Sequence, residues 1–242
     1  RLRSTSGLRL RTGPFVFAIK SPLEDVQQGL SLHYSHHVVH DDGPDSFCDF
    51  HISVRRPPGW RRFLRPQVQF LLDELSPFQP LPGHQGYAML EWGMNWTISS
   101  RAHQFIILHA AVLERRGQGL VMPAPSGAGK STLCAALSLR GWRLLSDELA
   151  LLDPSTGLLH PLVRPISLKN EAISVIRRFD PGAIVGREVH ETSKGVVAHL
   201  QPPAGAVRQS QTAVAPVWIV LPRFEAGAAT RFGRLPWIPR GN

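Results

Sequence analysis

One short stretch of this sequence has the residues that a phosphate-binding loop needs. Positions 121–132 read VMPAPSGAGKST, with an apolar strand pattern before them and a helical pattern after them. Glycines in such a loop let successive backbone N–H groups point at a phosphate, and the start of the following helix adds its dipole. The flanking strand and helix favour this interpretation over a chance Gly-Lys-Ser in a surface turn. The sequence therefore predicts a site for a nucleoside triphosphate.

Each part of the loop has an expected role. We expect Lys130 to reach the β- and γ-phosphate oxygens, and Ser131 to offer its hydroxyl to Mg²⁺. Ala124 stands where the usual pattern has its first glycine, which is harmless only if its φ angle is negative. ATP and Mg²⁺ are the cofactors implied. The predicted cofactor-binding loop consists of Ala124, Pro125, Ser126, Gly127, Ala128, Gly129, Lys130, Ser131 and Thr132.

An acidic pair, Asp147 and Glu148, follows the loop closely. Asp147 comes 17 residues after Lys130 (147 − 130 = 17), which leaves room for one helix and one strand. The first strand after the loop helix would then carry both carboxylates back beside the phosphates. This short connection argues against most transport and motor ATPases and suits kinases. A carboxylate there can hold Mg²⁺, for which we predict Asp147 with Ser131, or it can accept the proton of an attacking hydroxyl.

The surrounding sequence predicts the elements that position these residues. A strand, a tight turn and a second strand would form a hairpin that leads into the loop. A helix closed by Gly141 would follow, and then further strands on both sides of the acidic pair. The expected strands are 105–114, 119–122, 142–146, 149–153 and 158–163, and the expected helix is 131–140.

The first hundred residues have a different pattern. Short β-like pieces such as 15–19 and 50–54 lie between turn signals, while 67–75 has helical spacing. We therefore predict an accessory α+β lobe at 1–100 and a phosphate-loop domain at 101–242. On a helix, one face would carry the imidazoles of His33, His36, His37 and His40. A solvated or strand segment is favoured over a metal site there, because no second cluster of ligands accompanies them.

Composition limits the other function classes. The chain has 242 residues, of which 43% are apolar and 19% charged, an ordinary mixture for a globular protein. No apolar run reaches the length of a membrane span, and no leading apolar segment suggests a secretory signal, so we expect a cytoplasmic protein with no membrane partner. The net charge of +9 suits polyphosphate ligands. Nucleic acid is not an expected partner, because no motif that recognises nucleic acid accompanies the positive charge. The sequence does not decide between a monomer and a homo-oligomer.

The run from about Ile106 to Asp153 resembles the catalytic core of the HPr kinase/phosphorylase family. It holds LHAAVL, then the loop, then RGWRLLSDE. The segments 90–96, 164–170 and 192–195 are similar to a group called HPr-kinase-related kinase A. This resemblance implies an α/β fold with a P-loop core like that of HPr kinase and phosphoenolpyruvate carboxykinase. It also implies a catalytic set of His109, Lys130, Asp147 and Glu148.

These observations predict an ATP-dependent phosphotransferase. The acceptor would be a Ser or Thr hydroxyl of a protein or ribosomal peptide; HPr is not expected, because residues 164–171 replace the family's HPr-contacting signature. Arg164, Lys169 and Lys194 are cations in loop-like surroundings that we expect to contact the nucleotide. Two alternatives are a small-molecule kinase and a non-catalytic nucleotide-binding module. The long segment before the loop argues against the first, and the complete set of loop and acidic residues argues against the second.

Overall fold

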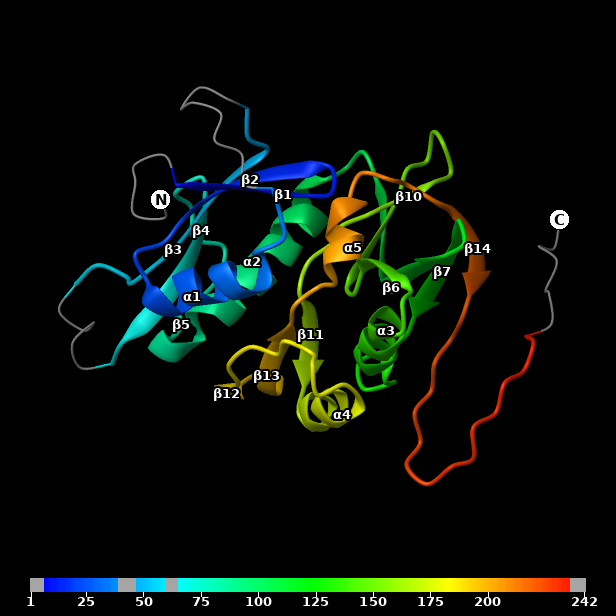
Figure 1. Cartoon of the computed structure of the whole chain (residues 1–242). Helices are drawn as coiled ribbons and strands as arrows, with labels where there is room; N and C mark the ends of the chain where they lie inside the picture. Colours follow the sequence, from blue (N-terminus) through cyan, green and yellow to red (C-terminus); the bar gives the residue numbers. More distant parts are fainter. Residues whose placement is uncertain (1–6, 39–46, 60–64, 236–242) are drawn as a thin grey trace, which may run out of the picture.

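The chain folds into several sheets with a few helices packed against them (Figure 1). The computed structural model describes residues 7–38, 47–59 and 65–235, and this part of the chain contains three sheets and has more residues in strands than in helices. The expected α/β class is confirmed in that the fold mixes helices and sheets.

The first sheet is built from residues before 83, in the order β1-β2-β3-β4-β5. Helices α1 (Glu24–His33) and α2 (Gly86–Arg101) pack on it, and the short η2 (Gly83–Gln85) leads into α2. The strands are β1 (Leu8–Thr12), β2 (Phe15–Lys20), β3 (Phe50–Arg55), β4 (Gln67–Leu72) and β5 (Leu81–Pro82). The strands expected at 15–19 and 50–54 are confirmed by β2 and β3.

The helix expected at 67–75 is wrong, because this segment is the strand β4. Val68, Phe70 and Leu72 alternate into the core beneath α2, which is the period of a strand. Antiparallel pairing with β3 on one side and β5 on the other fixes that conformation. The helical spacing counted Leu71, which is buried on the opposite face of the sheet, together with Leu75, which lies outside the strand and is exposed.

The second sheet has the order β10-β9-β6-β7-β14, with β8 also paired to β6. The hairpin expected before the loop is formed by β6 (Ile106–Arg115) and β7 (Gln118–Pro123). Its two turn residues, Arg116 and Gly117, both have positive φ, as the tightest hairpins require. The remaining elements are α3 (Lys130–Leu139), β8 (Arg143–Ser146), β9 (Leu149–Leu152), β10 (Leu159–His160) and β14 (Ala215–Ile219).

The expected strand at 158–163 is shorter in the structure, where β10 ends at His160. Pro161 follows and has no N–H with which to continue a ladder. The other elements expected after the loop agree with α3, β8 and β9. Cys134 is a free and fully buried cysteine in α3.

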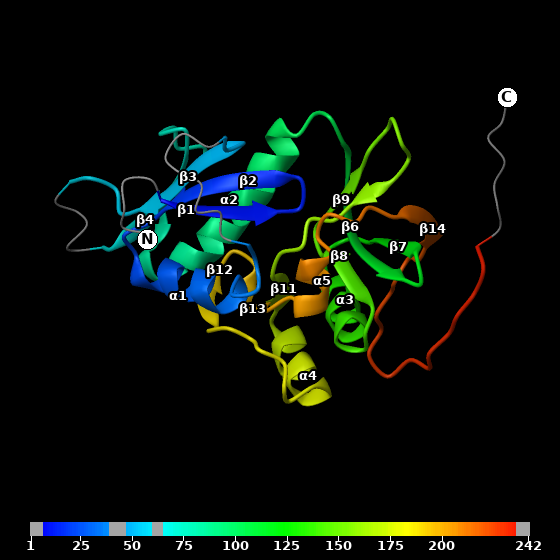
Figure 2. The same ribbon diagram turned by 45° about the horizontal axis from the view of Figure 1, so that its top comes forward.

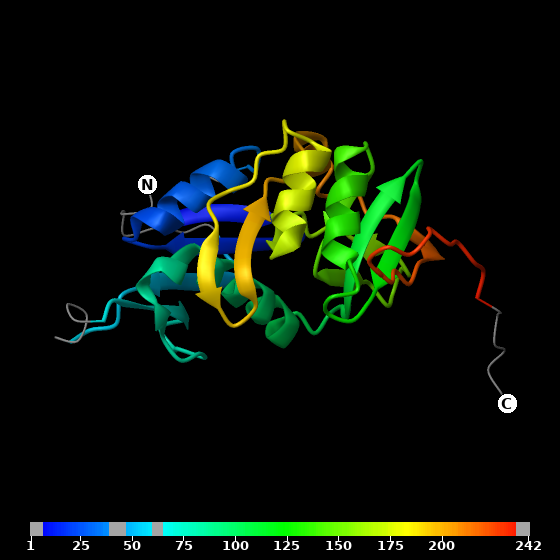
Figure 3. The ribbon, with the colours of Figure 1, turned by 90° about the horizontal axis from the view of Figure 1, so that it is seen from below.

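A third, smaller sheet has the order β11-β13-β12. Its strands are β11 (Ile166–Lys169), β12 (Val189–Thr192) and β13 (Gly195–Leu200). Helix α4 (Glu171–Phe179) follows β11 and lies beside α3 in Figure 3, and α5 (Ala204–Arg208) contacts β8. This arrangement brings the turn between β12 and β13 near the carboxyl end of β11.

Side chains on opposite faces of β6 enter different clusters. Ala111 and Leu113 pack with α3, whereas Ala110 and Val112 pack on the other face of the sheet. The largest core, around α1 and α2, also includes Leu149 and Leu151 of β9 and Leu162. The predicted domain boundary between residues 100 and 101 falls at the end of α2, and this core includes residues on both sides of it.

The described part of the histidine-rich segment, residues 32–38, is not a strand, and it is solvated only in part. Helix α1 ends at His33, and both His33 and His37 are buried, while His36 is exposed; His40 lies outside the described residues. The His33 ring lies between the carbonyl oxygens of Gly29 and His199, each 2.9 Å from a ring nitrogen. Within the described residues, no group of three metal-ligating side chains is present.

The helices of the described residues include none with the length and apolar character needed to cross a bilayer.

Candidate functional site

Strand β6 brings the phosphate loop and the acidic pair to the same level of the sheet. Strand β7 ends where Pro123 pairs with Ala110 of β6. On the other side of β6, β8 and β9 pair with successive parts of the same strand (Figure 2). Asp147 and Glu148 are the two residues between β8 and β9. The pair therefore interrupts a strand that runs beside β6, one strand away from the loop.

The loop has the backbone geometry expected of a phosphate-binding turn. Gly127 and Gly129 both have φ of +85°, a conformation that L side chains rarely adopt. Ala124 is not among the described residues with positive φ, so the condition for an alanine at this position is met. Helix α3 starts at Lys130, directly after the loop. Its free N–H groups and dipole therefore face the space in front of the loop.

Lys130 connects the loop to the acidic pair. Its Nζ donates a hydrogen bond to the backbone oxygen of Asp147 over 2.9 Å, and the side chain is 7% exposed. A buried ammonium group keeps its charge only with polar or anionic partners around it. The two carboxylates supply this environment, and the hydrogen bond to Asp147 holds the Lys130 side chain beside the phosphate loop.

Asp147 is a buried acid with an unusually high pKa. Burial raises the pKa of its carboxyl to about 6, although Lys130 and the nearby Ser131 hydroxyl act in the opposite direction. Its Oδ2 accepts a hydrogen bond from the backbone N–H of Ser167 over 3.2 Å. Its Oδ1 is buried without a well-aligned hydrogen-bond donor among the described residues. An oxygen in this state beside the Ser131 hydroxyl is suited to a metal ion.

Glu148 has the opposite electrostatic setting, because three lysines surround it. Burial alone would raise the pKa of this carboxyl, but Lys169, Lys130 and Lys194 outweigh burial, and the pKa is lowered. The Nζ of Lys169 lies 3.9 Å from Oε1 of Glu148. Both sequence-predicted cations, Lys169 at the end of β11 and Lys194 in the turn before β13, thus lie in the field of the acidic pair.

His109 and Lys194 also lie near Glu148. Burial, together with Lys130, lowers the pKa of the His109 imidazole, which keeps it neutral near pH 7. Burial also lowers the pKa of Lys194, whose Nζ lies 5.5 Å from the centre of the Trp92 ring. The structure therefore brings together six of the sequence-predicted site residues: His109, Lys130, Asp147, Glu148, Lys169 and Lys194.

Arg164 is an exception, because its guanidinium is held by α2. Its Nη2 donates to Oε2 of Glu91 over 2.6 Å and to the Glu91 backbone oxygen over 2.8 Å, and its Nη1 donates to Asn95. Tyr34 also contacts the pair, donating its hydroxyl to Glu91 over 2.8 Å. Arg164 and Glu91 are 6% and 3% exposed. Arg164 thus forms a buried ion pair that joins α2 to the segment before β11, and its contact with the nucleotide stays a prediction.

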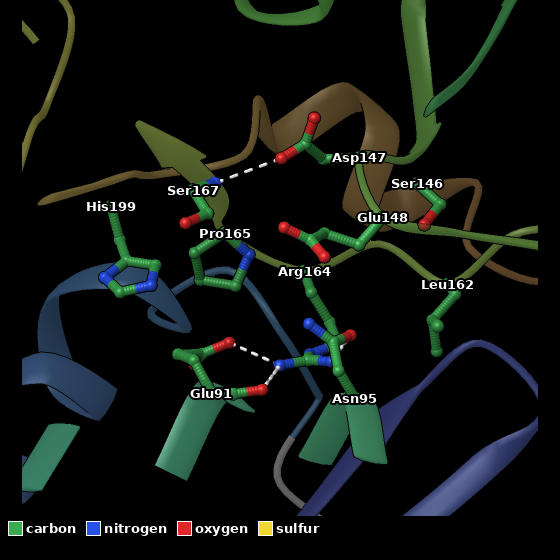
Figure 4. Close-up of a pocket in the computed structure, with 10 residues that line it drawn as sticks. All are labelled: Glu91, Asn95, Ser146, Asp147, Glu148, Leu162, Arg164, Pro165, Ser167 and His199. Carbon is green, nitrogen blue, oxygen red and sulfur yellow. Dashed lines mark hydrogen bonds and ion pairs between the residues drawn. The ribbon is translucent and has the colours of Figure 1, made fainter. Parts of the chain in front are cut away.

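A small polar pocket lies beside the acidic pair, and Figure 4 shows Glu148 directed into it. The cavity has a volume of about 20 Å³. Ser167 Oγ and His199 Nε2 are buried there without a hydrogen-bond partner among the described residues. Burial lowers the pKa of His199 to about 4, so this ring is neutral near pH 7. The lining residues are Glu91, Asn95, Ser146, Asp147, Glu148, Leu162, Arg164, Pro165, Ser167 and His199.

Sequence reasoning missed the wall of this pocket that comes from α2 and β13. Glu91 stands inside an apolar helical stretch, and a charged residue in such a stretch is a signal for a buried partner. Ser167 and His199 carried no comparable signal, because each stands alone in a short apolar strand. Their roles depend on the pairing of β11 with β13, where Ser167 stands opposite His199.

Comparison with family models gives a match to the family described as SynChlorMet cassette protein ScmC, over residues 88–162. The matched range runs from α2 through the hairpin, the phosphate loop and the acidic pair to β10. The resemblance to HPr kinase/phosphorylase, and to HPr-kinase-related kinase A, is therefore wrong as a family assignment. No curated protein matches the chain. The matched range is less than half of the chain, and it covers the predicted site residues except Arg164, Lys169 and Lys194.

Proposed function

We propose that this protein is an ATP- and Mg²⁺-dependent kinase with a phosphate-loop nucleotide site between β7 and α3. The observation that carries this proposal is the convergence of three lysines and two carboxylates at the mouth of a glycine-rich loop. Lys130, Lys169 and Lys194 come from three separate elements, yet all three lower the pKa of the same carboxyl, Glu148. Cations gathered in this way, beside the amides of a helix start, suit a polyphosphate.

The two acids would have different tasks. Asp147, with its buried and unpartnered Oδ1 next to Ser131, is suited to hold Mg²⁺ together with the Ser131 hydroxyl. Glu148, directed into the polar pocket, is suited to act as the base. A triphosphate bound to Lys130 and Lys169 would share their positive charge. The pKa of Glu148 would then rise towards the range of an effective base when the nucleotide is present.

In the proposed reaction, the acceptor hydroxyl gives its proton to the carboxylate of Glu148. The hydroxyl oxygen then forms a bond to the γ-phosphorus, and the bond between that phosphorus and the β,γ-bridging oxygen breaks. ADP leaves with the bridging oxygen and its electron pair. The lysines stabilise the charge on the transferring phosphoryl group and on the leaving diphosphate.

The pocket favours a hydroxyl carried by a protein or peptide side chain. A cavity of about 20 Å³ has room for one group of the size of a water molecule. A seryl or threonyl hydroxyl fits such a space. Ser167 and neutral His199 offer hydrogen-bonding atoms to this hydroxyl. We therefore infer that the acceptor is a Ser or Thr of a protein or ribosomal peptide.

The first test concerns the nucleotide. Replacement Lys130→Ala should weaken Mg²⁺·ATP binding about ten- to a hundredfold in calorimetric titration, because a charged hydrogen bond is worth about 1.5–3 kcal/mol. Lys20→Ala, an exposed lysine at the end of β2, is the matched control and should bind normally. Unchanged ATP affinity in Lys130→Ala would show that the loop is not a nucleotide site.

The second test concerns catalysis. Candidate peptides encoded beside the gene are incubated with protein, ATP and Mg²⁺, and phosphorylated residues are located by mass spectrometry. Glu148→Gln should lower the rate of transfer by about 10²–10⁴ while ATP still binds, since a general base contributes about that factor. Glu171→Gln, an exposed acid on α4, serves as the control. Transfer at the wild-type rate in both Glu148→Gln and Asp147→Asn would refute the roles of the acids. A phosphate found only on a small metabolite would refute the acceptor.

A further inference from the structure

The segment after β14 passes directly beside the phosphate loop. Strand β14 is the edge strand of the second sheet and pairs in parallel with β7, the strand that leads into the loop. Both strands therefore end at the same edge. In sheets with parallel strands, ligands bind beyond the carboxyl ends of the strands. The residues after β14, which are drawn in orange to red in Figure 1, thus leave the sheet on the side where a nucleotide would lie.

Backbone hydrogen bonds attach this segment to β7 and to the loop. The N–H of Val220 donates to the carbonyl of Val121 over 2.9 Å, and the N–H of Phe224 donates to the carbonyl of Ala128 over 3.2 Å. The Cβ of Phe224 lies 3.1 Å from the position that a Cβ on Gly129 would take. Phe224 is therefore fixed through its backbone against the tip of the loop.

The side chain of Phe224 is not part of any core. It is 70% exposed, although its backbone N–H is hydrogen-bonded to the phosphate loop. An exposed phenylalanine alone would need no explanation. Here its position is next to a loop whose amides and lysines can hold phosphates but offer nothing for the flat, apolar faces of a nucleobase.

We propose that Phe224 is the surface on which the purine base of the bound nucleotide stacks. This proposal rests on the proposed nucleotide site and adds the element that recognises the base. An aromatic side chain stacks on a base through the π faces of both rings, and this interaction needs no hydrogen-bond pattern. The loop would hold the phosphates, and the segment after β14 would hold the other end of the nucleotide.

The test separates base binding from phosphate binding. ATP and inorganic tripolyphosphate, each with Mg²⁺, are titrated calorimetrically into the wild-type protein and into Phe224→Ala, Phe224→Trp and Phe232→Ala. Phe232, which is 93% exposed on the same segment, is the matched control. Phe224→Ala should weaken ATP binding about five- to a hundredfold and leave tripolyphosphate binding unchanged. Phe224→Trp should keep the affinity for ATP, and Phe232→Ala should resemble the wild type.

Three outcomes would overturn the proposal. If Phe224→Ala binds ATP as the wild type does, the ring does not contact the base. If that variant binds both ligands more tightly, the segment covers the loop and competes with ligands. If ATP and tripolyphosphate lose affinity equally, Phe224 acts only by shaping the loop. By contrast, a wild-type protein that binds neither ligand would refute the nucleotide site itself, which distinguishes failure of the proposed function from failure of this inference.

Discussion

Removing the charge of Glu91 should destabilise the whole protein, because it leaves Arg164 buried without a counterion. The replacement Glu91→Gln keeps the size of the side chain and an oxygen that can accept a hydrogen bond. The two side chains of the pair are 7% and 4% exposed, and their closest atoms are 2.6 Å apart. The charge that remains on Arg164 cannot be transferred to water without opening the contact between α2 and the segment before β11.

The expected loss is about 3 kcal/mol in the free energy of unfolding. Breaking a buried pair by removing one partner typically costs about 3–5 kcal/mol. The lower end applies here because Arg164 keeps its hydrogen bonds to Asn95 and to the backbone oxygen of Glu91. The double replacement Glu91→Gln with Arg164→Met should recover much of this loss, since it removes the unpaired charge as well.

Urea denaturation of the wild type, Glu91→Gln, Arg164→Met and the double variant measures these differences. With a slope of about 2–3 kcal/mol per molar urea, the midpoint of Glu91→Gln should fall by about 1 M or more. The carboxyl of Glu91 is buried, but Arg164 more than offsets this effect and lowers its pKa below 4.5. Its stabilising contribution is therefore present above that pH and is lost on acidification. A Glu91→Gln protein as stable as the wild type, together with an Arg164→Met protein that has lost only ATP binding, would refute this reasoning and restore Arg164 as a nucleotide ligand.

Two further predictions concern the loop and the metal site. Burial raises the pKa of the Asp147 carboxyl to about 6. In the protein without nucleotide, this group should therefore lower the stability as pH rises from 3.8 to 6, and Asp147→Asn should melt at a higher temperature than the wild type at pH 7. Calorimetric melting that shows no such gain would contradict the buried charge. Gly129→Ala should lower the free energy of unfolding by at least about 1–2 kcal/mol in urea denaturation, because φ is +85° and the new Cβ would meet Phe224. Gly157→Ala, with φ of +68° and no atom within 4 Å of a new Cβ, measures the backbone cost alone. Equal losses in the two variants would refute the contact between residue 129 and Phe224.

The elements around the loop could be predicted because their signals are local. The hairpin, the loop, α3 and the acidic pair lie within one continuous run, and each has a sequence pattern that does not depend on distant residues. Lys169 and Lys194 were predicted to contact the nucleotide because the reaction needs cations, but no sequence pattern predicted that they lie near Glu148. Their actual positions follow from the antiparallel pairing of β11 with β13, which no short pattern indicates.

The differences between the expected and the observed surroundings of residues have the same physical origin. Residues 67–72 satisfy both a helical and a strand period, and only the neighbouring strands β3 and β5 decide between them. Arg164 stands in a Pro-flanked loop that looks exposed, while its partner Glu91 is 73 residues away in the chain. Burial of His33 and His37 likewise depends on the backbone of distant segments, including His199 and Val163.

The strand that carries the acidic pair links the two large cores of the molecule, and this has a consequence for its motions. Leu144 of β8 packs in the core around α3, whereas Leu149 and Leu151 of β9 pack in the core around α1 and α2. The amide protons of β8 and β9 should therefore exchange with solvent only when the whole protein unfolds. Asp147 and Glu148 would then lie between two strands that exchange only on complete unfolding, and their alignment would persist until both cores are lost together.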